Sequence, residues 1–204
     1  MPYGVGHQFR PPGEEESEWL KARHPLLRRD YVLYVGSLEP RKNLGRLFSA
    51  WAQILRDCPG VTLVIAGTAG RIFSGTGFER LPSRVHLLGR IGDGDLRALY
   101  GNAMAFVYPS LYEGFGLPPL EAMACGTPVV VSDAASMPEA VGDAALLVDP
   151  LEIDSIAFGL RAVLSDCSLR TDLQRRGLER AREFTWERAA KRTWQVLSDA
   201  AMAP

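Results

Sequence analysis

The sequence has no long apolar segment and no surplus of charge of either sign. No apolar run approaches the about 20 residues that a membrane-spanning helix needs, and the first residues lack the ordered regions of a signal peptide. The 23 basic and 24 acidic residues leave a net charge of −1, which gives no electrostatic reason to expect nucleic acid as a partner. We therefore expect a cytoplasmic protein, with a peripheral position at the inner face of the membrane as an alternative.

Cysteine is scarce, and two common nucleotide-binding motifs are missing. Cys58, Cys125 and Cys167 are far apart and odd in number, which fits neither a disulfide framework nor the close ligand pairs of a zinc site. No G-x-G-x-x-G follows the first predicted strand, and G-x-x-x-x-G-K-[ST] does not occur. These absences argue against a nicotinamide or flavin oxidoreductase and against a P-loop phosphotransferase.

Short apolar runs alternate with amphipathic stretches of helical period, a pattern typical of parallel βαβ units. Strands are predicted at 31–35, 61–66, 85–88, 105–108, 129–131 and 145–148, and helices at 44–57, 93–102, 118–125 and 136–141. After Pro150 only helices follow, at 153–164, 169–184 and 186–200. The sequence therefore predicts an α/β fold, a Rossmann-like doubly wound parallel sheet of about six strands with C-terminal helices.

Three segments lie outside this alternation. Residues 1–13 are rich in glycine and proline and are expected to form an extended linker, followed by a short helix at 14–26, so that the main domain is expected at 31–204. Residues 67–77 contain four glycines and are expected to form a mobile loop. The last two helices carry an arginine-rich face, interpreted as a solvated surface, with contact to an anionic membrane or partner as the alternative. Its members are Arg170, Arg175, Arg176, Arg180, Arg182, Arg188 and Arg192.

The first candidate site follows the first strand, because ligands of open parallel sheets bind beyond the carboxyl ends of the strands. Gly36 would let a ligand approach the backbone, and Asn43 is a candidate N-cap for the next helix. The helix N-terminus offers free N–H groups, to which Lys42 adds a full charge and Arg41 a candidate second one. The pattern favours a phosphate site, although a surface lysine before a helix is also common.

The second candidate site is the glycine-bearing loop and helix start at 109–128. Pro118 and Pro119 are expected to start a helix with Glu121 in its first turn, where a carboxylate is favourable even without a ligand. Glu113 lies in the loop itself, so the helix N-terminus does not explain a carboxylate at this position. We expect both carboxylates to face one cleft as acceptors for sugar hydroxyls, beside backbone N–H groups that can hold a diphosphate.

The third candidate site follows the strand at 85–88. Exposed backbone at Arg90 and Ile91 could contact the edge of a base. The alternative is an ordinary turn before the helix that begins at Asp93.

The segment Glu113-Gly-Phe-Gly-Leu-Pro-Pro-Leu-Glu121 matches the E-x7-E signature of the glycosyltransferase family 4-like (group 1) proteins. The wider sequence from Tyr31 to Leu197 resembles the C-terminal, nucleotide-sugar-binding domain of their two-domain GT-B fold. The loop at 36–43 resembles the phosphate loop of that domain, and 85–108 its base-binding strand, helix and next strand. This resemblance implies a retaining glycosyltransferase that needs no metal and no other cofactor.

The resemblance also implies roles for matching residues. Lys42 and Glu113 would be the catalytic residues, binding the diphosphate and the sugar hydroxyls respectively, and Glu121 would hold the ribose. The full set of implied donor-binding residues is Gly36, Ser37, Arg41, Lys42, Arg90, Ile91, Glu113, Gly114, Phe115, Gly116, Leu117 and Glu121. Many family members have arginine at the position of Ser37, so either Arg41 supplies the second cation or Lys42 and the backbone suffice.

A complete enzyme of this kind has an N-terminal, acceptor-binding domain, which this sequence lacks. Its opening resembles the interdomain linker, so we interpret it as an excised domain, a truncated product or one subunit of a split enzyme. The expected reaction transfers a hexosyl group from a GDP- or UDP-sugar to a glycan or lipid-linked acceptor, and a mannosyl group is favoured. The isolated chain is expected to catalyse this transfer inefficiently. The alternatives are a non-catalytic nucleotide-sugar-binding or structural module and an epimerase-like protein of the same fold.

Overall fold

Six parallel strands form the centre of the molecule, as the sequence predicts. The structure is a computed structural model and describes residues 3–28, 30–67 and 81–202. The strands are β1 (Tyr31–Val35), β2 (Thr62–Ala66), β3 (Val85–Gly89), β4 (Ala105–Tyr108), β5 (Val129–Ser132) and β6 (Leu146–Val148). Their order in the sheet is β3-β2-β1-β4-β5-β6. This is the strand order of a doubly wound, dinucleotide-binding type of sheet, which confirms the predicted fold class.

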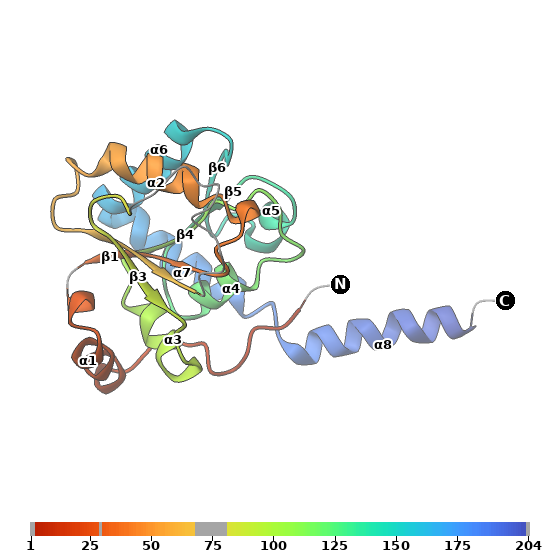
Figure 1. Ribbon diagram of the computed structural model, residues 1–204. Helices are drawn as coiled ribbons and strands as arrows, with labels where there is room; N and C mark the ends of the chain where they lie inside the picture. Colours follow the sequence, from red (N-terminus) through yellow and green to blue (C-terminus); the bar gives the residue numbers. More distant parts are fainter. Residues whose placement is uncertain (1–2, 29, 68–80, 203–204) are drawn as a thin grey trace.

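Helices cover both faces of the sheet (Figure 1). Helix α2 (Leu44–Ile54) packs against α6 (Ile153–Ser165) on one face. On the other face lie α3 (Asp93–Gly101) and α4 (Leu117–Ala124), with α7 (Cys167–Ala181) against α4. Helix α5 (Met137–Val141) connects β5 to β6, and α1 (Glu14–Arg23) packs against α3. Two short 3₁₀ helices, η1 (Pro25–Arg28) and η2 (Pro40–Lys42), precede β1 and α2.

The core is built from strands that are buried on both faces, because helices cover each side. All residues of β2, β4 and β5 are buried, which explains why these strands are continuous apolar runs rather than alternating ones. Gly159 shows how closely α6 approaches the sheet, since a Cβ there would lie 2.5 Å from Val148 Cγ1. Any larger side chain at this position would push the helix away from β6.

Several predicted boundaries are wrong by a few residues. Helix α2 ends at Ile54 rather than at residue 57, and α1 ends at Arg23 because Pro25 follows. Helix α7 begins at Cys167 rather than at residue 169, since the Asp166 carboxylate accepts a hydrogen bond from Leu169 N at 2.9 Å and caps the first turn. The predicted loop at 67–77 lies, apart from its first residue, outside the described residues.

Part of the arginine-rich face is not simply solvated, contrary to that interpretation. Arg170 donates to the carbonyl groups of Val163 and Leu164, both at 2.9 Å. Arg176 reaches the carbonyl group of Asp143, and Arg180 turns inward to the backbone of α5. These side chains fix helix ends through backbone acceptors, a role that a list of charged positions does not reveal.

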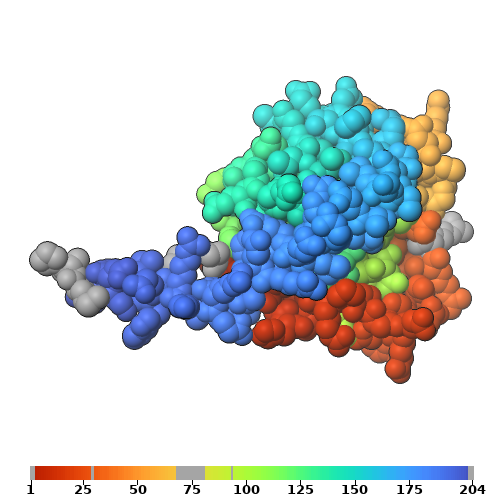
Figure 2. Space-filling model, turned by 180° about the vertical axis from the view of Figure 1, so that it is seen from behind, coloured from red at the N-terminus to blue at the C-terminus, as the bar shows by residue number. Residues whose placement is uncertain are grey.

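The N-terminal segment lies against the residues that precede the last helix. Val5 N donates to Phe184 O at 2.9 Å, so the segment predicted as a linker is attached to the start of the last helix, α8 (Trp186–Met202). From there α8 projects away from the body (Figures 1 and 2). Trp194 on this helix is 73% exposed. Within the described residues, no helix is both long and apolar enough to cross a membrane.

Candidate functional site

The sheet order creates a cleft between β1 and β4. These strands are neighbours, but the chain leaves β1 towards β2 on one side and β4 towards β5 on the other. The loops beyond their carboxyl ends therefore separate at this point, which is the usual ligand-binding position of such sheets. Gly36 follows β1 and Pro109 follows β4, so the first two predicted sites meet here.

The loop after β1 packs backbone against backbone. Gly36 N donates to Ala66 O at 3.0 Å, and a Cβ on Gly67 would lie 1.9 Å from Gly36 O. Because only glycine allows this approach, the position of the Gly36 peptide is fixed by the end of the neighbouring strand β2. The neighbouring Ser37 presents its carbonyl oxygen to Tyr34 Oη at 3.0 Å.

Asn43 stands at the start of α2, as expected for an N-cap, but its side chain does not cap the helix. It has φ 61°, in the left-handed region that asparagine tolerates. Its Nδ2 donates to Pro109 O at 3.0 Å and to Pro150 O at 2.6 Å. Asn43 therefore acts as a clamp, in the sense that it joins the loops that follow β4 and β6 by hydrogen bonds instead of capping the helix. The buried carbonyl groups of these loops need a hydrogen-bond donor.

Lys42 is the most enclosed cation of the two loops, with only 5% of the residue exposed. Its Nζ donates to Glu113 Oε1 at 2.5 Å and also contacts Tyr108 Oη. The same Nζ lies 4.7 Å from the centre of the Tyr108 ring. Tyr108 is held by stacking against Tyr34 and Phe106, each at 5.7 Å between ring centres. Burial, and then the charge of Glu113, raise the pKa of Tyr108, so its hydroxyl stays protonated at neutral pH.

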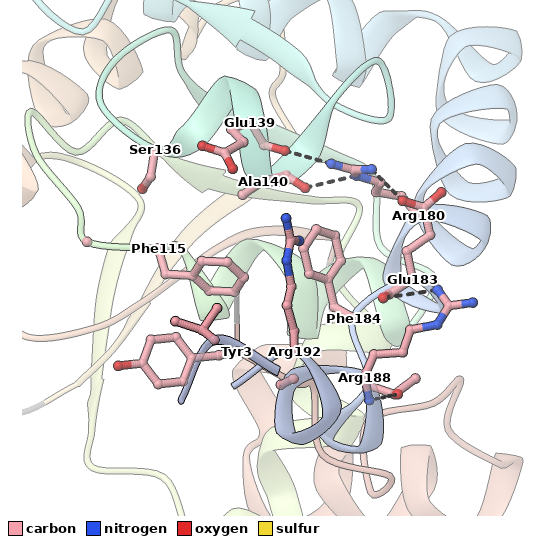
Figure 3. A pocket seen from close by; sticks show the side chains of 14 residues that line it. Tyr3, Phe115, Ser136, Glu139, Ala140, Arg180, Glu183, Phe184, Arg188 and Arg192 are labelled. Atoms are coloured by element: carbon pink, nitrogen blue, oxygen red, sulfur yellow. Dashed lines mark hydrogen bonds and ion pairs between the residues drawn. The ribbon is translucent and has the colours of Figure 1, made fainter. Parts of the chain in front are cut away.

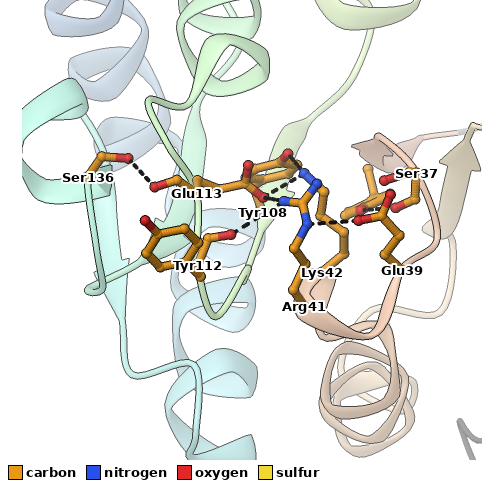
Figure 4. Close-up of polar contacts among 9 residues, drawn as sticks. Ser37, Glu39, Arg41, Lys42, Tyr108, Tyr112, Glu113 and Ser136 are labelled. Atoms are coloured by element: carbon orange, nitrogen blue, oxygen red, sulfur yellow. Dashed lines mark hydrogen bonds and ion pairs between the residues drawn. The ribbon is translucent and has the colours of Figure 1, made fainter. Parts of the chain in front are cut away.

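Arg41 completes a small ion cluster at the mouth of the cleft (Figure 4). Its Nη1 lies 3.0 Å from Glu113 Oε1 and its Nε 2.8 Å from Glu39 Oε2. Ser136 Oγ donates to the Glu113 carbonyl oxygen at 3.0 Å, which fixes the backbone that carries the carboxylate. Two cations and two carboxylates thus balance, and an anionic ligand would compete with Glu113 for Lys42 and Arg41.

The glycine-bearing loop leads into α4 through a glycine with a positive φ angle. Gly116 has φ 102°, and a Cβ there would lie 2.3 Å from Met137 Cε, so only glycine fits. Pro118 and Pro119 have no N–H, so they remove two of the donors that a helix N-terminus normally offers. The donors available to a ligand are therefore those of the preceding segment, which includes the predicted residues Gly114, Phe115, Gly116 and Leu117.

Glu121 is not in the first turn of its helix, contrary to the expectation, because α4 already begins at Leu117. The explanation from the helix dipole alone therefore does not apply to it. Its Oε2 accepts a hydrogen bond from Tyr100 Oη of α3 at 3.0 Å. The carboxylate thus lies against α3, whereas that of Glu113 lies against the loop after β1.

The third predicted site lies apart from the other two. Arg90 and Ile91 follow β3, the edge strand, which is two strands away from β1. At about 4.8 Å per strand, this is a separation of about 10 Å. Arg90 is exposed, and Ile91 is half-buried against the core at the start of α3. Helix α3 also carries Tyr100, so the Tyr100–Glu121 bond connects this side of the cleft to α4.

Three residues of the cluster, Glu39, Tyr108 and Ser136, were not predicted from the sequence. Tyr108 is the last residue of β4 and Ser136 immediately precedes α5. The position of Tyr108, one residue before the candidate loop, is a signal that could have identified it. Among the residues that the structure describes, no group of three or more His, Cys, Asp or Glu side chains is placed to hold a metal ion.

A family model decides the relationship of this chain to known proteins. The model described as "Glycosyl transferases group 1" matches residues 17–180. The chain belongs to this family. The predicted relationship is thereby confirmed.

Curated relatives are glycosyltransferases of several kinds. The chain is 40% identical over 178 residues to the O-antigen chain mannosyltransferase B of Escherichia coli, covering 84% of this chain and 46% of the relative. It is 33% identical over 191 residues to a glycogen synthase of Mycobacterium tuberculosis, covering 90% of this chain and 46% of that one. The chain thus spans about half the length of these group 1 relatives.

Solved structures show the same relationship. The sucrose-phosphate synthase of Thermosynechococcus elongatus has a TM-score of 0.82 at 31% identity, and the match covers 100% of this chain and 52% of that one. HepE of Anabaena, solved with UDP and glucose, has a TM-score of 0.80 at 23% identity, covering 96% and 55%. The second likeness is one of fold alone. Each match covers about half of the longer solved chain.

Proposed function

We propose that this chain is the donor-binding half of a retaining hexosyltransferase, which holds a nucleotide-sugar in the cleft between β1 and β4. The observation that carries the proposal is the convergence of Lys42 and Glu113 at this cleft, with Nζ and Oε1 2.5 Å apart. A cation for a diphosphate and a carboxylate for sugar hydroxyls are the two groups that such a donor needs at adjacent positions.

The proposed donor extends across the cleft from its sugar to its base. Lys42 and Arg41 bind the diphosphate, together with backbone N–H groups of the loop that precedes α4 and of Gly36. Glu113 accepts hydrogen bonds from hydroxyls of the transferred sugar, and Glu121 from the ribose. The base lies near Arg90 and Ile91. The separation of about 10 Å between β1 and β3 suits the span from a diphosphate to a base.

Transfer in this scheme requires neutralisation of the leaving diphosphate. Lys42 and Arg41 supply two positive charges, and the N–H groups before α4 add oriented dipoles, so the reaction is proposed to need no metal. We assign no general base and no protein nucleophile, and propose that the leaving phosphate accepts the acceptor proton with retention of configuration.

The 40% identity to an O-antigen mannosyltransferase favours a mannosyl donor, GDP- or UDP-linked. The acceptor is proposed to be a glycan or a lipid-linked glycan on the cytoplasmic side of a membrane. Because the relatives are about twice as long, we expect efficient transfer to require a second domain or subunit that binds the acceptor.

Calorimetric titration tests the donor site directly. GDP, UDP and their mannose and glucose derivatives are titrated into the wild-type chain, Lys42→Ala and Glu113→Gln. We expect one base to be preferred and Lys42→Ala to weaken binding about tenfold or more through loss of a charge-assisted bond. Glu113→Gln should lose the extra affinity contributed by the sugar, while the nucleoside diphosphate itself binds more tightly because no carboxylate competes for Lys42. Lys21→Ala on α1 and the exposed Glu15→Gln are matched controls that should change nothing.

Each other outcome has a defined meaning. Binding that Lys42→Ala leaves unchanged would place the nucleotide elsewhere and refute the proposed site. Binding without transfer, even after a matching N-terminal half is added, would indicate a non-catalytic sensing module instead. Efficient transfer by this chain alone would refute the need for a second half.

A further inference from the structure

A second cavity adjoins the donor cleft, and the proposed donor does not occupy it. It lies between α5, the end of α7 and the first half of α8, and the N-terminal segment contributes Tyr3 to its wall (Figure 3). Its volume is about 950 Å³, which is at the upper end of the range for pockets that hold small molecules. We name it the arginine pocket after Arg180, Arg188 and Arg192, which line it.

One wall of the arginine pocket is aromatic. The ring centres of Tyr3 and Phe115 are 5.4 Å apart, and those of Phe115 and Phe184 are 5.7 Å apart, both pairs in edge-to-face geometry. Tyr3 belongs to the N-terminal segment, Phe115 to the glycine-bearing loop before α4, and Phe184 to the segment before α8. Together they form a continuous apolar surface against which the C–H face of a sugar ring can pack.

The three arginines differ in how many of their donors are free. Arg180 is fully engaged, because it donates to the carbonyl groups of Ala140 at 3.0 Å and Glu139 at 2.6 Å and pairs with the Glu183 carboxylate. Arg188 donates once from its side chain, to Glu183 O at 3.2 Å. Arg192 has no hydrogen-bond or ion-pair partner within the described part of the chain, and Figure 3 shows its side chain extending into the cavity that Phe115 and Phe184 also line.

The charges of the pocket do not cancel. Arg180 and Glu183 neutralise each other as an ion pair. This leaves Arg188 and Arg192 against one lining carboxylate, that of Glu139. The pocket therefore has an excess positive charge at the end lined by α8 and a hydrogen-bond acceptor, Glu139, at the end lined by α5.

The pocket shares a wall with the donor site. Gly114, Phe115 and Ser136 line it, and Ser136 Oγ donates to the carbonyl oxygen of Glu113. A ligand hydroxyl beside Ser136 would thus lie next to the loop that carries the proposed sugar-binding carboxylate.

We infer that the arginine pocket binds a carbohydrate that carries a phosphate ester. The phosphate lies against the free guanidinium groups of Arg192 and Arg188, since a guanidinium matches phosphate oxygens in pairs. Glu139 and Ser136 hydrogen-bond to sugar hydroxyls, and the sugar packs on the aromatic wall. The interpretation of this ligand as the acceptor rests on the proposed donor function, whereas the binding site itself does not.

The test measures binding to the 204-residue chain by calorimetry. Mannose 1-phosphate, mannose and inorganic phosphate are titrated into wild type, Arg192→Gln and the control Lys191→Gln, which removes a neighbouring charge that does not line the pocket. We expect saturable binding of the sugar phosphate, weaker binding of either fragment, and a loss of about tenfold or more in Arg192→Gln alone, as for a charge-assisted bond. Because Arg192 is exposed, this variant should fold normally.

Three results would overturn the inference. The first is that mannose 1-phosphate does not bind, or binds Arg192→Gln as well as wild type. The second is that inorganic phosphate binds as tightly as the sugar phosphate. The third is that Arg192→Gln and Lys191→Gln weaken the binding of mannose 1-phosphate equally, which would indicate a general surface charge.

Lys42→Ala separates this inference from the proposed function. We expect this variant to lose nucleotide binding and to keep sugar-phosphate binding. Nucleotide binding that responds to Lys42→Ala, beside sugar-phosphate binding that ignores Arg192→Gln, would refute the pocket and leave the donor site standing. The reverse pattern would refute the donor site and leave the pocket standing.

Discussion

Glu113 holds together the two loops of the donor cleft, so its replacement by glutamine has an effect on stability that can be estimated. Its side chain is 12% exposed and that of Lys42 is 6% exposed. Loss of one partner from a fully buried pair costs about 3–5 kcal/mol. Glutamine keeps the shape and a carbonyl oxygen for Lys42, and the cleft mouth is partly solvated, so we expect a loss of about 2–3 kcal/mol.

For a chain of this length, such a loss lowers Tm by about 4–12 °C, at about 2–4 °C per kcal/mol. Saturating nucleoside diphosphate should raise the Tm of Glu113→Gln by more than it raises that of wild type, because in the variant no carboxylate competes for Lys42. Thermal unfolding followed by circular dichroism, with and without the nucleotide, measures both effects.

Glu39→Gln is the matched control, because Glu39 also pairs with Arg41 but its side chain is 51% exposed. An exposed ion pair contributes little, so this variant should melt close to wild type. If Glu113→Gln melted no lower than Glu39→Gln, Glu113 would not be the internal counter-ion of Lys42, and the competition between carboxylate and diphosphate would be refuted.

Three further predictions concern the frame of the cleft. Asn43→Ala leaves two buried carbonyl groups without their donor and should cost about 2–4 kcal/mol in urea unfolding; a loss below about 1 kcal/mol would contradict the clamp. Gly67→Ala places a Cβ against Gly36 O, so we expect the free energy of unfolding to fall by about 3 kcal/mol or more and nucleotide binding to be lost. A fully stable variant would disprove the close packing. Burial raises the pKa of Cys125 to about 12, so iodoacetamide at pH 8 should label the exposed Cys167 but spare Cys125 until denaturant is added; equal labelling of both would show that Cys125 is accessible.

The fold was predictable because burial on both faces makes the central strands short apolar runs that the flanking helices do not share. β1, for example, has the predicted bounds, Tyr31–Val35. Helix ends were less predictable. The start of α7 depends on the Asp166 side chain, which could equally have pointed to solvent.

The candidate cleft was predictable in outline from strand ends, but its contacts were not. The sequence places Lys42 and Glu113 after different strands, and only the sheet order brings them to the same point. Asn43 has the residue type of a cap and acts as a clamp, because two carbonyl groups from distant loops happen to lie within its reach. Local pattern cannot reveal partners that are 66 and 107 residues away.

The arginine pocket could not be predicted at all. Its walls combine Tyr3, Phe115 of the glycine-bearing loop and Arg192, so its existence depends on how the first and last segments of the chain are placed. From the sequence alone, Arg192 is one charge among many on an amphipathic helix. It differs from the adjacent Lys191 in that it lines the cavity, together with Phe115 and Phe184 (Figure 3).

The hydrogen bond from Val5 N to Phe184 O joins two segments that are almost a full chain length apart. A Cβ on Gly4 would lie 2.3 Å from Trp186 N, so the backbones are in contact there as well. A displacement applied to residues 3–5 would therefore reach the first turn of α8 directly, without crossing the sheet. Both segments border the arginine pocket, because Tyr3 and Arg188 line it, so a rotation of α8 would change the size of that pocket.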